Sequence, residues 1–127
     1  MEIRFISGWI GADLMPAIPP DPIMCQIVLL LQNKSESETV RGISFPGARV
    51  FLSSSHQRLG QISFSTDWDG EIEPAIADTV RLTKLISSTT LFNPPCDKYV
   101  YLELIILQPN DSTRTFKTDN LLFACAH

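Results

Sequence analysis

The run from Ile23 to Gln32 constrains the fold of this chain more than any other stretch. Eight of its ten residues are apolar, a proline-rich segment precedes it, and the polar turn 33–38 follows it. A short apolar run between turn signals is either a strand or part of a core helix. Its length and the preceding prolines favour a strand buried on both faces, and it is far too short to span a bilayer.

Alternating residues predict further strands. In residues 60–66, Ile62 and Phe64 alternate with polar residues, which is typical of a half-solvated strand in an antiparallel sheet. Residues 99–107 form a second long apolar strand, with Leu104 at its centre. Residues 43–52 contain a Pro-Gly pair, so they form one bent strand or two short ones. The other expected strands cover residues 2–10, 79–85, 113–118 and 121–126.

Residues 78–87 also fit a second interpretation. An amphipathic helix capped by Asp78 is the alternative to a strand, because Val80, Lys84 and Ser87 could share a helical face. The β-branched residues of this segment favour the strand.

The N-terminal segment 1–22 combines apolar side chains with prolines and glycines. Prolines remove backbone donors, so we expect residues 11–22 to be a kinked edge strand or an extended loop. An apolar edge strand is a pairing template unless it is covered. The segment therefore either folds over its own domain or packs on a second copy, and we favour a homodimer formed through residues 1–22, since symmetric dimers are the commonest oligomers.

Turn signals every 8–12 residues indicate a β-sandwich or a β-barrel. Residues 94–104, Pro-Pro-Cys-Asp-Lys-Tyr-Val-Tyr-Leu-Glu-Leu, resemble the penultimate strand of immunoglobulin-like and fibronectin type III-like sandwiches. By that resemblance, Tyr99 or Tyr101 would form a tyrosine corner. The chain departs from antibody domains, because strand 99–107 lacks a cysteine to pair with Cys25 and the third strand lacks a tryptophan. The resemblance implies an all-β, immunoglobulin-like sandwich of two antiparallel sheets, with seven or eight strands in one domain over residues 1–127.

Charge and the N-terminal residues limit the partners and the compartment. The net charge is −4 and the basic residues are scattered singly, which argues against nucleic acid and against anionic membranes. The first residues lack the basic and apolar regions of a signal peptide, so the expected location is the cytoplasm if Met1 is the natural start.

The three cysteines do not have the spacing of a disulfide framework. We expect three free thiols in a reducing compartment, with Cys25 and Cys125 in the core and Cys96 exposed in a loop. Zinc signatures carry paired ligand spacing, which these cysteines lack.

Candidate catalytic and metal-binding residues are few. His56 follows three serines in a turn, but neighbours in sequence do not make a catalytic triad. The acidic group Asp67, Asp69, Glu71 and Glu73 is a weak candidate for a hard cation, although it does not match the calcium-loop pattern. The sequence therefore predicts no catalytic residue and no cofactor.

Two tryptophans are the candidate partner contacts. Trp68 lies in an acidic turn and Trp9 in the N-terminal segment, and exposed aromatic residues are preferred interface anchors. The expected function is a non-catalytic protein-binding or structural module that contacts other protein chains. One alternative is a small intracellular proteinase inhibitor acting through loop 87–97, and another is a small-ligand carrier or an enzyme. Asn33 and Asn110 match the N-glycosylation pattern, which without a secretion signal we interpret as chance.

Overall fold

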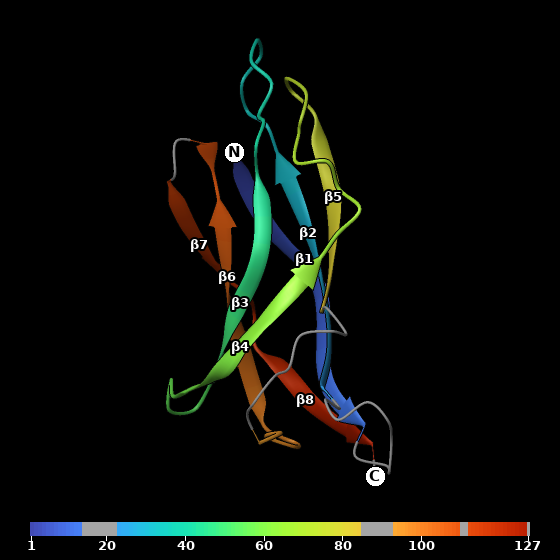
Figure 1. Ribbon diagram of the computed structural model, residues 1–127, viewed down its shortest axis with the longest axis vertical. Helices are drawn as coiled ribbons and strands as arrows, with labels where there is room; N and C mark the ends of the chain where they lie inside the picture. The colour runs from blue at the N-terminus through green and yellow to red at the C-terminus, as the bar shows by residue number, and fades with distance from the viewer. Residues whose placement is uncertain (14–22, 85–92, 110–111, 127) are drawn as a thin grey trace.

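The computed structural model describes residues 1–13, 23–84, 93–109 and 112–126, and eight strands account for their regular structure (Figure 1). The strands are β1 Glu2–Asp13, β2 Ile23–Gln32, β3 Ser44–Leu52, β4 Arg58–Ser65, β5 Ala77–Lys84, β6 Tyr99–Leu107, β7 Thr113–Lys117 and β8 Leu121–Ala126. Within these ranges, no helix has the length and hydropathy needed to cross a membrane.

The sheet closes on itself. The strand order is β3-β4-β5-β2-β1-β8-β6-β7, and β3 also pairs with β6, so seven strands form a closed barrel and β7 extends the edge of β6. Two pairings complete the ring: β3 with β6, and β8 in parallel with β1 over residues 10–13 and 123–126. The all-β class with eight strands is confirmed, whereas the two-sheet immunoglobulin-like sandwich is wrong. Both architectures need one buried face per strand, so alternation alone did not distinguish them.

The long strands have the predicted bounds but not all the predicted burial. β2 and β6 begin and end at the predicted residues. In β2, Ile27, Leu29 and Leu31 are fully buried inside the barrel, while Leu30 is half-buried on the outer face. The expectation that β2 is buried on both faces is therefore wrong, because a barrel wall has only one inner face. Residues 77–84 form a strand, so the helical alternative is wrong over 78–84, and residues 85–87 lie outside the described range.

A β-bulge in β1 explains the orientation of Trp9. The register between β1 and β2 shifts between Phe5 and Ser7, which adds a residue to β1. Ile3 therefore faces inward before the bulge and Ile10 after it, whereas Trp9 lies on the outer face and is 50% exposed. This strand lies at a sheet edge over part of its length. Residues 2–12 pair with β2, and β8 adds a second neighbour at residues 10–13 only, so residues 2–9 pair on one side among the described strands.

Neither tyrosine of β6 forms the tyrosine corner that the resemblance implied. Tyr99 is exposed on the outer surface. Tyr101 is buried on the outer face of the barrel, where its ring stacks on Phe51 and its hydroxyl lies 2.8 Å from Nδ1 of His56. The Nζ atom of Lys117 lies 4.2 Å from the centre of the Tyr101 ring. His56 follows the 53–55 turn and is exposed, and its ring contacts the Tyr101 ring.

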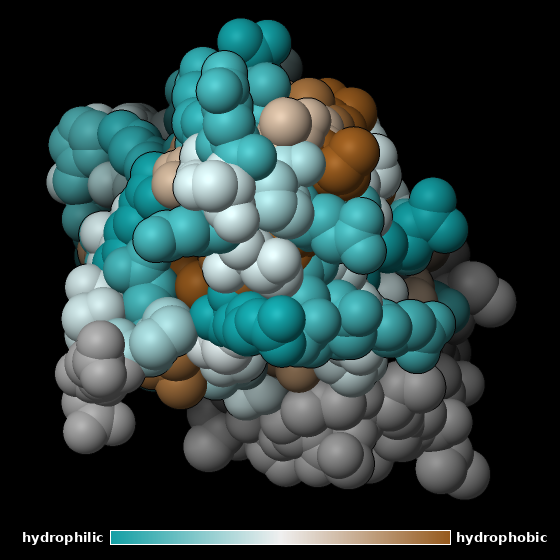
Figure 2. Space-filling model, turned by 90° about the horizontal axis from the view of Figure 1, so that it is seen from above, coloured by the Kyte–Doolittle hydropathy of each residue, from teal (hydrophilic) through white to brown (hydrophobic). Residues whose placement is uncertain are grey.

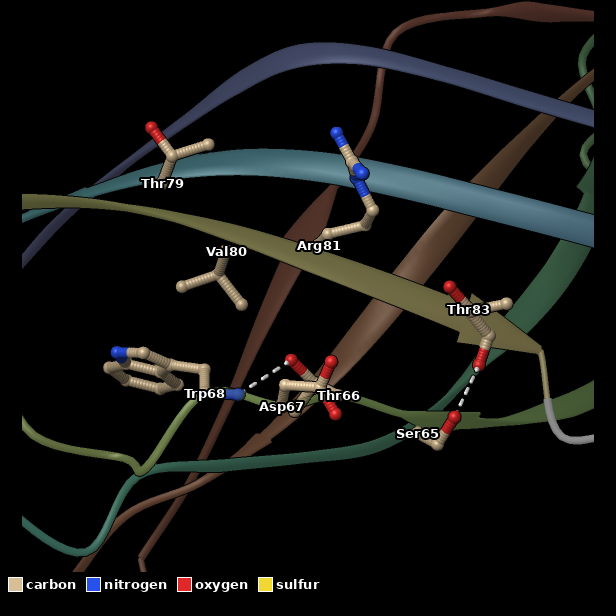
Figure 3. A pocket seen from close by; sticks show the side chains of 8 residues that line it. All are labelled: Ser65, Thr66, Asp67, Trp68, Thr79, Val80, Arg81 and Thr83. Atoms are coloured by element: carbon tan, nitrogen blue, oxygen red, sulfur yellow. Dashed lines mark hydrogen bonds between the residues drawn. The ribbon is translucent and has the colours of Figure 1, made fainter.

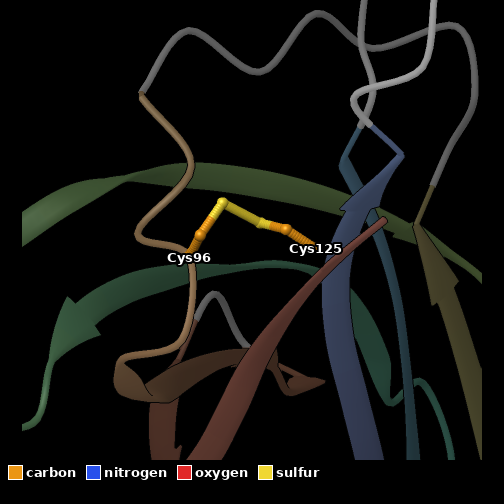
Figure 4. Close-up of a disulfide and its surroundings, with 2 residues drawn as sticks. All are labelled: Cys96 and Cys125. Carbon is orange, nitrogen blue, oxygen red and sulfur yellow. A yellow bond between two sulfur atoms is a disulfide. The ribbon is translucent and has the colours of Figure 1, made fainter. Parts of the chain in front are cut away.

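A disulfide joins Cys96 to Cys125, so the prediction of three free thiols is wrong (Figure 4). The backbone pairing sets up this bond. Asp97 donates its N–H to the Phe123 carbonyl, and Phe123 donates its N–H to the Lys98 carbonyl, which places the loop before β6 beside β8. Cys25 is buried in the barrel as predicted, and burial raises its pKa to about 12 despite the opposing charge of Lys84.

Candidate functional site

The acidic residues predicted as a weak cation site do not converge. The Asp69 carboxylate accepts the backbone N–H of Glu71, and the Glu71 carboxylate lies 3.4 Å from the Arg41 guanidinium. Asp67 instead lines a groove beside β5. Across the described ranges, no three histidine, cysteine or acidic side chains are grouped as metal ligands. These residues therefore act singly, in a turn and an ion pair.

Trp68 folds back against the barrel and keeps part of its surface exposed. Its ring packs on Phe45, with 6.0 Å between the ring centres, and its indole N–H donates to the Asp78 carboxylate at 3.4 Å. Its backbone N–H donates to the Thr66 hydroxyl. Trp68 is thus held in one orientation from two sides, and its position as a partner contact stays a prediction.

The chain after β4 follows the segment that leads into β3 and does not follow β5. Val40 and Ile72 exchange two backbone hydrogen bonds of 2.9 Å, and Ile43 donates its N–H to the Gly70 carbonyl. Gly70 has a φ of 84°, and a Cβ at this position would lie 2.6 Å from the Ile43 carbonyl oxygen. A side chain there would force the two segments apart.

As a result, β4 and β5 are paired at one end only. Phe64 pairs with Lys84 and Ser65 with Thr83, and no further pairing between these strands is formed. On its other side, β5 pairs with β2 along its whole length from Ala77 to Thr83. In the described part of the chain, no strand therefore pairs with the β4-facing edge of β5 from Ala77 to Leu82.

Two hydrogen bonds identify which backbone groups of β5 lie at this free edge. The Ser65 hydroxyl donates to the Thr83 carbonyl, so the backbone groups of Thr83 point toward β4. The N–H of Asn33, just after β2, donates to the Ile76 carbonyl, so residue 76 points toward β2. Because the backbone groups of alternate strand residues point to the same edge, those of Thr79 and Arg81 point toward β4. They face a position where the described chain supplies no partner.

A half-open groove of about 400 Å³ lies along this edge (Figure 3). Thr79 and Arg81 project from one side of β5, and Val80 projects from the other, between β5 and the Trp68 indole. The remaining lining residues are Ser65, Thr66, Asp67 and Thr83. Arg81 is exposed and forms no ion pair with any described residue. The groove thus joins free backbone groups, an aromatic surface and an uncompensated cation.

A second unpaired edge, on β1, is protected. The part of β1 before Ile10 pairs with β2 only, among the described strands. It carries the bulge between Phe5 and Ser7, and the Arg114 guanidinium donates to the Met1 carbonyl beside it. Bulges and charged side chains are the usual means by which proteins prevent edge pairing. β5 has neither a bulge nor a proline along its free edge, and its exposed charged side chain there is Arg81.

The predicted contact Trp9 is not among the residues that line the groove. It faces outward from β1, as Met24 does from β2 and Leu122 from β8, and all three are about half exposed. By contrast, the end of the barrel viewed in Figure 2 is mostly hydrophilic, with hydrophobic residues in separate small groups. Trp9 as a partner contact also stays a prediction.

The structure also describes Asn33, which matches the glycosylation pattern, and part of the proposed inhibitor loop. The side-chain nitrogen of Asn33 is buried and donates to the carbonyls of Glu38, Ile72 and Glu73, so it is not available to a glycan in the folded chain. Of the proposed inhibitor loop 87–97, residues 93–97 are described and are anchored through Cys96. Residues 87–92, Asn110 and His127 lie outside the described range.

Sequence reasoning did not identify Thr79 and Arg81 as site residues. It predicted the strand that contains them, but an edge position depends on which strands lie beside it. Comparison with protein-family models, with curated proteins and with solved structures found no match.

Proposed function

We propose that this protein is a non-catalytic protein-binding module, and that its partner adds an extended segment to the free edge of β5. The observation that carries the proposal is the unpaired backbone of Thr79 and Arg81 beside a groove. In β-strand addition, main-chain hydrogen bonds to a sheet edge supply affinity, and neighbouring pockets supply specificity. Both elements are present here.

The backbone edge favours a polypeptide over a small molecule. A groove of about 400 Å³ is within the range of small-molecule sites. However, a small ligand would leave the regularly spaced donors and acceptors of β5 without matched partners. A strand presents complementary groups at the same spacing.

The disulfide bears on the compartment in which this binding takes place. Disulfides persist in oxidising compartments and are rare in the cytosol. The Cys96–Cys125 bond therefore favours an oxidising compartment over the expected cytoplasm. A partner would then be met outside the reducing cytosol.

Selection from a phage library of random linear dodecapeptides tests the proposed function. Binding peptides should be enriched on the wild-type protein and lost on Arg81→Pro, which removes one edge N–H and is tolerated at a strand edge. Arg81→Ala is the matched control, because it keeps the N–H. Circular dichroism of both variants reports whether the barrel is intact.

Amide hydrogen exchange on the wild-type protein gives a second test that needs no variant. The amides of Thr79 and Arg81 should exchange faster than those of Val80 and Leu82, and a bound peptide should slow them. The proposal is overturned if no peptide is enriched. It is also overturned if the enriched peptides bind without protecting these two amides.

A further inference from the structure

We infer that the segment bound along β5 has an apolar–acidic–apolar core, with its apolar side chains on the face of the sheet that carries Val80 and Trp68 and its acidic side chain beside Arg81. This inference rests on the proposed function and specifies its partner. It follows from the alternation of side chains that pairing with β5 would impose on any added strand.

The inward-facing positions of an added strand meet an apolar floor. Val80 points toward the barrel interior, and the partly exposed Trp68 indole lies next to it in the groove. The hydrogen bond to Asp78 and the contact with Phe45 fix that indole in place. A rigid aromatic surface of this kind is a preferred anchor for apolar side chains.

The side chain between the two inward-facing positions of the added strand would point outward, beside the Arg81 guanidinium. Arg81 lies on the outer face of β5 between Thr79 and Thr83, and the residue across from it on β2 is Val28. No described carboxylate pairs with it. A carboxylate on the added strand would lie directly beside the guanidinium, as cross-strand neighbours of opposite charge do.

Asp67 limits how many acidic residues the partner can place in the groove. It lines the opposite wall of the groove, on the segment that follows β4. Its negative charge would disfavour a partner with several acidic residues in the groove. The acidic residue is therefore expected beside β5, at the position next to Arg81, and not at the flanking apolar positions.

The test uses three synthetic peptides that contain Val-Glu-Val, Val-Gln-Val or Val-Lys-Val between identical polar flanks. The wild-type protein should bind the glutamate peptide about fivefold more tightly than the lysine peptide, with glutamine between them, and added salt should reduce the difference. Arg81→Glu should reverse the order. Arg58→Glu makes the same change in net charge on β4 and should leave the order unchanged.

Trp68→Ala separates the apolar part of the inference from the charged part. It should weaken all three peptides by at least threefold without changing their order. If the peptides bind, require the Arg81 N–H and yet do not discriminate charge, the inference fails while the proposed function stands. If none of the peptides binds and phage selection also yields none, both fail.

Discussion

Removing the Cys96–Cys125 disulfide should destabilise the fold by about 3.5 kcal/mol. The two cysteines are 29 residues apart. A cross-link of that span restricts the unfolded chain, and the loop-closure entropy gives about 3.5 kcal/mol at 25 °C. With the usual unfolding entropy per residue, a chain of 127 residues would melt roughly 13 °C lower.

The suitable variant is Cys96→Ser/Cys125→Ser, because changing one cysteine alone would leave a reactive thiol. Urea unfolding followed by tryptophan fluorescence and circular dichroism gives the free energy of unfolding. Its slope against urea should rise in the variant, since an unfolded chain without the cross-link exposes more surface. The wild-type protein in reductant should behave like the variant. Cys25→Ala is the control, because it removes a cysteine but leaves the bridge.

Thiol titration of the unreduced protein in denaturant checks the premise. One thiol, from Cys25, should react. Three reactive thiols would refute the disulfide. One reactive thiol together with a stability loss under about 1 kcal/mol would refute the entropic estimate instead.

Four further predictions concern single residues. Leu29→Ala should cost about 2–5 kcal/mol in urea unfolding, and Leu30→Ala clearly less, because only Leu29 is fully buried inside the barrel. Asn33→Asp should cost about 1–3 kcal/mol in the same assay, since its carboxylate would face three backbone carbonyls that now accept hydrogen bonds from the amide. Gly11→Ala should cost about 1–3 kcal/mol, because a Cβ there would overlap the backbone of β8. Burial raises the pKa of Cys25 from 9.0 to about 12, so the unfolded state loses its proton first, and stability should fall as the pH rises from about 9 to 12; Cys25→Val should remove this part of the alkaline loss.

The sequence predicted the strands well because each of them has a local pattern. β2 and β6 are apolar runs with clear ends, and Ile62 and Phe64 in β4 are buried as their alternation required. The orientation of Trp9 could not be predicted in the same way. It depends on one extra residue near Phe5, and a β-bulge there has no reliable sequence signal.

Closure of the sheet and the disulfide depend on pairings between distant strands. β1 pairs in parallel with β8, and their residues are more than a hundred positions apart. Periodicity reports which face of a strand is buried, but it does not report which strand lies beside it. The approach of Cys96 to Cys125 follows from another such pairing, that of β6 with β8, and spacing along the chain does not reveal it.

The groove exists because residues 66–68 do not pair with the free edge of β5. If β4 continued its pairing past Ser65, residues 66–68 would occupy that edge. They leave it because the loop that follows is bound elsewhere, through the Val40–Ile72 bridge and the contact between Gly70 and Ile43. The packing of Trp68 on Phe45 also holds these residues away from that edge. The same contacts therefore leave the edge of β5 exposed and hold the Trp68 ring beside it. An incoming strand would meet a site that needs little rearrangement, which reduces the free-energy cost of binding.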